Sequence, residues 1–219
     1  MEIAPAPPDV AAAPDLQVVT TLDELREVVP EPHVSLWEKD IGRIDGSART
    51  FIEASPFLLL STSGPDGTCD VTPRGDPAGS VLVLDEHTLV IADRRGNRRL
   101  DALRNILDNP HVGLLFVIPG RPDTLRVNGT ARLVRDAPFF DRLTVQGVRP
   151  ALAVVVTVQE LFLHCAKAFL RAGLWDPETW PDPAAVPSIG QMAKAMRNLD
   201  VPAEEIDAAL AHDAEHHRY

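Results

Sequence analysis

A closely spaced series of strand-like segments in the middle of the chain constrains the fold more than any other feature of the sequence. Between residues 57 and 163, short runs of apolar and β-branched residues are separated by turns rich in glycine, proline and aspartate. One helical pattern interrupts them at 98–107, where Leu100 and Leu103 share a face. Strands that are not separated by regular helices argue against a doubly wound parallel sheet and predict a small barrel or sandwich.

Two hairpins are predicted at the start of this series. The turn Gly64-Pro65-Asp66-Gly67 joins the first two strands, because proline presets φ and glycine supplies a positive φ. Those strands are expected at 57–62 and 69–72, the second hairpin at 81–84 and 88–92, and later strands at 112–118, 124–134 and 153–163. We predict a mainly β fold of about six strands with flanking helices.

The two ends of the sequence differ from this middle part. Residues 1–18 are rich in alanine and proline and cannot build a core, so a disordered arm is expected. Thr21 and Glu24 have the spacing of a capping box and predict a short helix. Further helices are expected at 48–54, 165–172, 188–199 and 203–216. The domain boundaries that follow are 1–18 for the arm, 19–175 for the β domain and 176–219 for a proline-rich connector with C-terminal helices packed on the barrel or on a dimer partner.

Charge and composition exclude several classes of function. The net charge of −11 disfavours nucleic-acid binding, which needs a basic surface. No apolar run approaches the length of a membrane span, and no secretory signal is visible, so a cytoplasmic protein without a membrane partner is expected. Cys69 and Cys165 share no ligand spacing with histidine, and His212 and His216 lack a third ligand, so we expect no metal site.

The most unusual local feature is the run Asp93-Arg94-Arg95-Gly96-Asn97-Arg98-Arg99, which holds four arginines and one aspartate in this acidic chain. It lies where a predicted strand ends and a predicted helix begins. Arginine in the first turn of a helix is electrostatically unfavourable unless an anion occupies the site, and Asn97 is a suitable N-cap. The cluster therefore predicts a phosphate site held by guanidinium groups. A solvated basic loop paired with the acidic surface is the open alternative.

Several segments occur in an order that resembles the pyridoxamine 5′-phosphate oxidase-like flavoproteins. They are Asp70-Val71-Thr72-Pro73-Arg74, then Leu89-Val90-Ile91-Ala92-Asp93, then Gly96-Asn97-Arg98-Arg99, then Asn109-Pro110-His111-Val112-Gly113-Leu114-Leu115-Phe116, and finally the strand containing Val127-Asn128-Gly129-Thr130-Ala131. The resemblance covers about residues 50–170. The segment from Phe162 to Ala168, followed by Arg171 and Trp175, is similar to one FMN-binding subgroup of that family.

The resemblance implies that the strands, expected to number six, form a split β-barrel, and that two copies form a homodimer with FMN at the subunit interface. The C-terminal helical extension of this barrel is predicted from the helical patterns at 188–199 and 203–216. It implies an FMN-dependent oxidoreductase that acts with a small-molecule redox partner. The cofactor-binding residues that it indicates are Val71, Thr72, Pro73, Arg74, Ala92, Asp93, Asn97, Arg98, Arg99 and Thr124, with Lys167, Arg171 and Trp175 reaching the site from the partner subunit. It indicates no catalytic acid or base.

The end of the sequence departs from the family pattern. Pyridoxamine 5′-phosphate oxidases end in a basic substrate-binding segment and a short strand, whereas this sequence ends in Glu215-His216-His217-Arg218-Tyr219 on a predicted helix. Oxidation of vitamin B6 is therefore not predicted, and the substrate stays open. Alternative functions are a split barrel that binds the deazaflavin F420, a haem protein with His164 as its axial ligand, and a non-catalytic flavin-binding module.

Overall fold

The computed structural model describes residues 16–37 and 39–219, which belong to two units, residues 1–39 and residues 40–219. In the first unit, α1 (Leu22–Val28) has the predicted capping box: the Glu24 amide donates to the Thr21 hydroxyl, and the Glu24 carboxylate accepts from the Thr21 amide. A short 3₁₀ turn, η2 (Val34–Leu36), follows. Of the predicted arm at 1–18, residues 1–15 lie outside the described residues.

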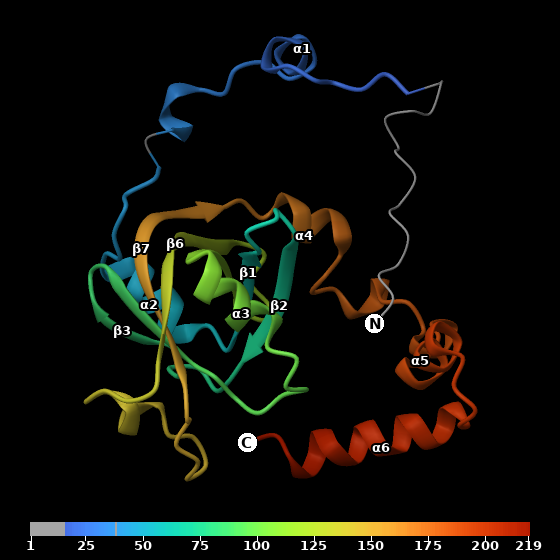
Figure 1. The fold of residues 1–219 in the computed structure, drawn as a ribbon. Helices are drawn as coiled ribbons and strands as arrows, with labels where there is room; N and C mark the ends of the chain where they lie inside the picture. The colour runs from blue at the N-terminus through green and yellow to red at the C-terminus, as the bar shows by residue number, and fades with distance from the viewer. Residues whose placement is uncertain (1–15, 38) are drawn as a thin grey trace. The chain divides into compact units, whose positions relative to one another are not determined.

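The second unit is built on one antiparallel sheet of seven strands in the order β2-β1-β5-β6-β7-β4-β3 (Figure 1). The strands are β1 (Phe57–Ser63), β2 (Cys69–Gly75), β3 (Leu82–Asp85), β4 (Thr88–Ala92), β5 (His111–Val117), β6 (Thr124–Val134) and β7 (Ala153–His164). Each of the seven strand segments expected from the sequence forms a strand, so the expected total of about six strands was too low by one. Among the described strands, β2 and β3 are the two edges and do not pair with one another, so the predicted barrel is not closed.

The sheet turns about the long pair β6 and β7. β5 pairs with the first half of β6, whereas β4 pairs with the first half of β7, which lies opposite the second half of β6. The register shifts between Asn128 and Gly129, and a Cβ at residue 129 would overlap the backbone oxygen of Thr157. Glycine is therefore required where the two halves of the sheet change direction.

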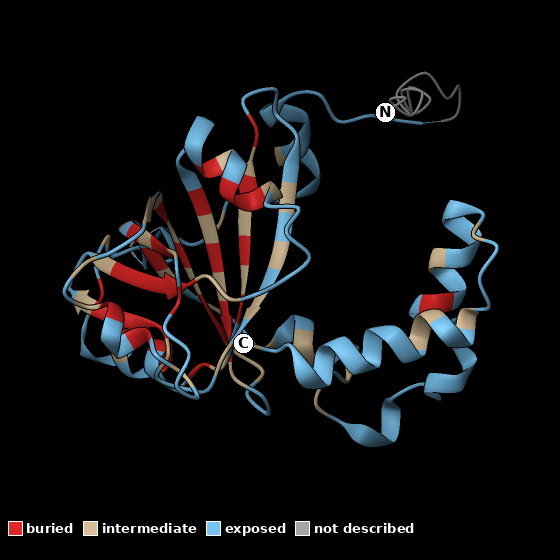
Figure 2. Ribbon diagram, turned by 60° about the horizontal axis from the view of Figure 1, so that its bottom comes forward, coloured by how far each residue is buried: buried red, intermediate tan, exposed pale blue. Residues whose placement is uncertain are grey.

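Two helices cover one apolar core. α2 (Gly46–Ala54) begins at Asp45, whose carboxylate accepts from the Ala48 amide, and it buries Phe51 and Ile52. α3 (Asp101–Asp108) buries Leu103 and Ile106 against the sheet. Figure 2 shows that the buried residues concentrate in the strands and in these helices. A smaller cluster forms where η3 (Phe140–Leu143) packs its two terminal residues against Val90 and Ala153.

The chain after β7 forms the predicted helical extension. It contains α4 (Lys167–Ala172), two 3₁₀ turns, η4 (Pro177–Thr179) and η5 (Pro183–Ala185), and then α5 (Ile189–Arg197) and α6 (Ala203–His216). The Asp207 carboxylate joins α6 to the start of α5 by accepting from the Ser188 hydroxyl at 2.6 Å and from the Gly190 amide at 2.7 Å. In the described part of the chain, no helix is both long enough and apolar enough to cross a membrane.

Candidate ligand pocket lined by arginines

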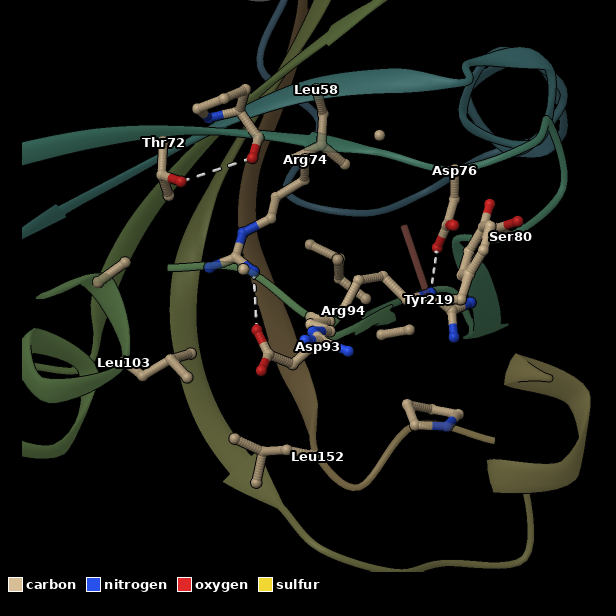
Figure 3. Close-up of a pocket in the computed structure, with 18 of the residues that line it drawn as sticks. Leu58, Thr72, Arg74, Asp76, Ser80, Asp93, Arg94, Leu103, Leu152 and Tyr219 are labelled. Atoms are coloured by element: carbon tan, nitrogen blue, oxygen red, sulfur yellow. Dashed lines mark hydrogen bonds and ion pairs between the residues drawn. The ribbon is translucent and has the colours of Figure 1, made fainter. Parts of the chain in front are cut away.

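A cavity of about 860 Å³ lies between β2, the end of β4, the loop that leads into α3, and the last residues of the chain (Figure 3). Seven arginines and four aspartates line it, so its wall is net positive in a protein of net charge −11. Such a surface attracts anionic ligands. The structure brings together in this wall the predicted residues Val71, Thr72, Pro73, Arg74, Ala92, Asp93, Asn97, Arg98 and Arg99.

Two ion pairs connect β2 and the residue that follows it with the segment that follows β4. Arg74 Nη1 donates to Asp93 Oδ1 at 2.8 Å, and Arg94 Nε donates to Asp76 Oδ2 at 2.7 Å. Both pairs are largely buried, with the side chains of the second pair 13% exposed. Arg94 Nη2 also donates to the backbone oxygen of Leu143. Arg94 is thus held by the protein itself and acts as a structural part of the wall.

The other three arginines of the cluster are differently placed. Arg99 pairs with Asp101 at 2.8 Å in an exposed position. Within the described residues, Arg95 and Arg98 form no ion pair. These two side chains, together with Arg218, which also lines the pocket and forms no ion pair among the described residues, supply positive charge that the fold leaves uncompensated in the pocket wall.

The predicted helix at 98–107 starts later than expected. α3 begins at Asp101, and its N-cap residue is Leu100, which has a left-handed backbone (φ 65°) and no side-chain cap. Arg98 is also left-handed (φ 62°), and a right-handed helix cannot include either residue. The Asn97 side chain accepts from the Arg99 amide at 3.0 Å, so the prediction that Asn97 caps the helix and that Arg98 and Arg99 lie in its first turn was wrong.

Two non-glycine residues with positive φ within three positions make the loop costly. Each such residue costs on the order of 1–3 kcal/mol, and such strain clusters at sites that bind ligands. The loop is also exposed, so apolar packing does not compensate this cost. The arginine cluster consequently lies in a loop that precedes α3, and α3 itself carries an acidic residue, Asp101, in its first turn.

Three polar atoms in the pocket wall are buried without a hydrogen-bond partner among the described residues. They are Arg74 Nε, Arg94 Nη1 and Asp76 Oδ1. Such buried groups are costly to leave without partners, and they lie within the wall, beneath the surface that a ligand would contact. The exposed guanidinium groups of Arg95 and Arg98 fit a ligand that carries a phosphate group, as FMN does.

Three predicted residues do not line the cavity. Thr124 is buried in β6, where it pairs with His164 of β7. Lys167 and Arg171 lie exposed on α4. The role expected of these two residues needs a partner subunit, and it stays a prediction.

The two aromatic candidates also lie outside the cavity lining. The indole nitrogen of Trp175 donates to the Arg121 backbone oxygen at 2.7 Å. His164, the proposed axial ligand of haem, lies beside Phe162 with ring centroids 4.8 Å apart. Burial, with a smaller effect from Arg126, lowers the pKa of His164. No group of three potential metal ligands occurs in the segments that the structure describes.

Among the wall residues that sequence reasoning missed are Asp76, Arg149, Leu152 and Tyr219. Asp76 could have been inferred from charge spacing. Arg74 and Asp76 lie two residues apart at the end of a predicted strand, and Asp93 and Arg94, of complementary charge, follow another predicted strand. The other three come from distant parts of the chain and form no motif with the arginine cluster.

Comparisons with known proteins agree with the sequence resemblance. The family model for pyridoxamine 5′-phosphate oxidase matches residues 44–165. No protein of curated function matches the chain. Solved structures with a similar fold include HupZ of Group A Streptococcus, with 18% identity, a TM-score of 0.45, and coverage of 55% of this chain and 93% of that one.

Two further structures have a similar fold. An FMN-binding protein of Syntrophomonas wolfei is 11% identical, with a TM-score of 0.40 and coverage of 53% of this chain and 88% of that one. HutZ, a haem storage protein of Vibrio cholerae, is 16% identical, with a TM-score of 0.37 and coverage of 55% and 94%. Since the family model covers more than half of the sequence, the chain belongs to the pyridoxamine 5′-phosphate oxidase family.

Proposed function

We propose that this protein binds FMN in the arginine-lined pocket and acts as an FMN-dependent oxidoreductase whose substrate is not pyridoxamine phosphate. The observation that carries this proposal is the combination of a cavity of about 860 Å³ with the exposed guanidinium groups of Arg95 and Arg98, which form no ion pair among the described residues. Cavities of roughly 300–1,000 Å³ are typical of cofactor sites. Membership of the pyridoxamine 5′-phosphate oxidase family supports FMN as the ligand.

The phosphate of FMN would be held by Arg98 and Arg99, with Arg95 adding charge and Asn97 fixing the loop. The guanidinium groups make charge-assisted hydrogen bonds that a neutral ligand cannot match. The shape of the loop, set by the left-handed residues Arg98 and Leu100, would orient these groups toward the ligand.

The ring system would lie along β2. Because β2 is an edge strand, one side of its backbone pairs with no other described strand. Its free N–H and C=O groups near Val71 and Thr72 would bind the polar edge of the isoalloxazine ring, whereas Pro73 has no N–H to offer. Bound FMN would supply hydride transfer, and the surrounding arginines would stabilise the negative charge of its reduced form.

The dimer is part of this proposal. Val71 on β2 is 63% exposed and Leu163 on β7 is 56% exposed. A second copy that covered these apolar side chains would also bring Lys167 and Arg171 of the partner subunit near the cofactor, as the family resemblance implies. The curled sheet of each copy would then be one half of a split-barrel dimer.

Replacing Arg98 with alanine tests the phosphate site. The loss of one charge-assisted hydrogen bond, on the order of 1.5–3 kcal/mol, is expected to raise the Kd for FMN by about tenfold to a hundredfold. Riboflavin lacks the phosphate, so its Kd should be unchanged. Titration of each variant by quenching of flavin fluorescence measures both constants.

The matched control is Arg104→Ala. Arg104 lies on α3, outside the cavity lining, and its loss should leave the Kd for FMN unchanged. Equal binding of FMN and riboflavin to the unaltered protein would contradict the phosphate assignment. F420 would use the same arginines and is separated from FMN by the mass of the bound ligand, whereas haem would give a Soret band that depends on His164.

A further inference from the structure

Tyr219 lies at the arginine-lined pocket although it comes from the far end of the sequence. It follows α6, and together with Arg218 it forms part of the cavity wall. Figure 3 shows its side chain beside Asp76, Ser80 and Arg94. Its ring centroid lies 5.6 Å from Arg94 Cζ, within the range of a cation–π contact.

The chemistry of this contact favours a docked side chain. Arg94 is fixed by Asp76 and by the Leu143 backbone, so a rigid cation is presented to the ring face. The charged groups that face the phenol are Asp76, Arg94 and Arg218. Partial burial, and then the negative charge of Asp76, raise the pKa of Tyr219, as expected for a phenol held against this ion pair.

The docked side chain leaves the pocket open to a ligand. The cavity measures about 860 Å³ with Tyr219 in its wall, which is ample for a cofactor. Tyr219 therefore lines the pocket without filling it. α5 and α6 join one another through Asp207, and Tyr219 is where the segment after α6 meets the sheet.

We propose that Tyr219 is a ligand-pocket residue, which docks on the Asp76–Arg94 pair and slows the escape of the bound ligand. The identity of that ligand as FMN rests on the proposed function, whereas the docking of Tyr219 on Asp76 and Arg94 is independent of it. A side chain that covers the end of a pocket acts mainly on the dissociation rate, because the ligand must wait for it to move.

Docking is tested without any ligand. The sequence contains one tyrosine, so biosynthetic incorporation of m-fluorotyrosine gives a single fluorine NMR signal. In the folded protein this signal is expected to be shifted from its position in urea, and Asp76→Asn and Arg94→Met should each move it toward that position. A signal that already coincides with the unfolded one in the unaltered protein would overturn the docking.

Ligand retention is tested by stopped-flow dissociation of FMN. Tyr219→Ala is expected to increase the dissociation rate about tenfold, equivalent to the loss of one good contact, and to lower the melting temperature of the apoprotein only slightly. Tyr219→Phe keeps the ring over Arg94, so its dissociation rate should lie between those of the unaltered protein and Tyr219→Ala. His212→Ala on α6, outside the cavity lining, is the control.

These outcomes separate the two proposals. Equal dissociation rates for the unaltered protein and Tyr219→Ala would overturn the role of Tyr219 in retention while leaving FMN binding intact. If the unaltered protein takes up no FMN, the proposed function fails, and the fluorine signal still decides whether Tyr219 docks.

Discussion

At the scale of single residues, the pocket is organised by pairs of opposite charge whose members are far apart in the sequence. Arg74 and Asp76 lie on or beside β2, and their partners Asp93 and Arg94 follow β4. Because the sheet places these two strands near its opposite edges, the ion pairs span the opening between them. Replacing one member of such a partly buried pair leaves the other charge without its partner. This lowers the free energy of unfolding more than replacing both members does.

Tyr219 provides a pH-dependent readout at this scale. Its pKa in the folded protein lies above the ordinary value of 10.0, owing to burial and to Asp76. A raised folded-state pKa means that the docking contributes stability below pH 10, and that this contribution is lost as the pH rises through the folded-state pKa. Tyrosinate absorbance should therefore develop at a higher pH than in the urea-unfolded protein. Coinciding titration curves would contradict the docked position.

At the scale of elements, the bend in the β6–β7 pair determines where the pocket forms. At the bulge, Gln159 of β7 has no partner opposite Asn128 and Gly129 of β6. The first half of β6 pairs with β5, and the part of β7 opposite its second half pairs with β4. This bend places the β4 end, which carries the arginine cluster, opposite β2. The loop and α3 then complete the wall.

Gly129→Ala tests this role of the bulge. The added methyl group would overlap the Thr157 backbone, which cannot move without disturbing the pairing of β7. We expect a loss of about 2–4 kcal/mol in the free energy of unfolding, measured by urea denaturation.

Gly113→Ala is the matched control, since Gly113 lies in β5 and a Cβ there meets only side-chain atoms, the nearest at 3.4 Å. Its effect should stay within about 0.5 kcal/mol. Similar losses for the two variants would show that the bulge has no special requirement for glycine.

At the scale of the whole molecule, local signals in the sequence predicted the elements better than their assembly. The turn Gly64-Pro65-Asp66-Gly67, the capping box at Thr21 and the two amphipathic helices before Tyr219 are encoded by neighbouring residues, and the structure confirms them. The pairing of β4 with β7 joins segments separated by about 60 residues, and no local pattern reports it.

The pocket could likewise be predicted only where its residues follow one another in the sequence. The family resemblance indicated the strand residues at 71–74 and 92–93, the local charge drew attention to the arginine cluster at 93–99, and these segments line the cavity. The start of α3 was misplaced, since apolar periodicity at Leu100 and Leu103 cannot reveal that Leu100 has a left-handed backbone. Arg149 and Tyr219 reach the pocket only through the folded chain, so no spacing rule could have assigned them.

The absorption spectrum of the purified protein after incubation with FMN, combined with the mass of any released ligand, decides whether the pocket binds a flavin. We expect flavin bands and a released mass equal to that of FMN, both strongly reduced in Arg98→Ala. A colourless protein that neither retains nor takes up FMN would contradict the assignment of the arginine-lined pocket as a flavin site.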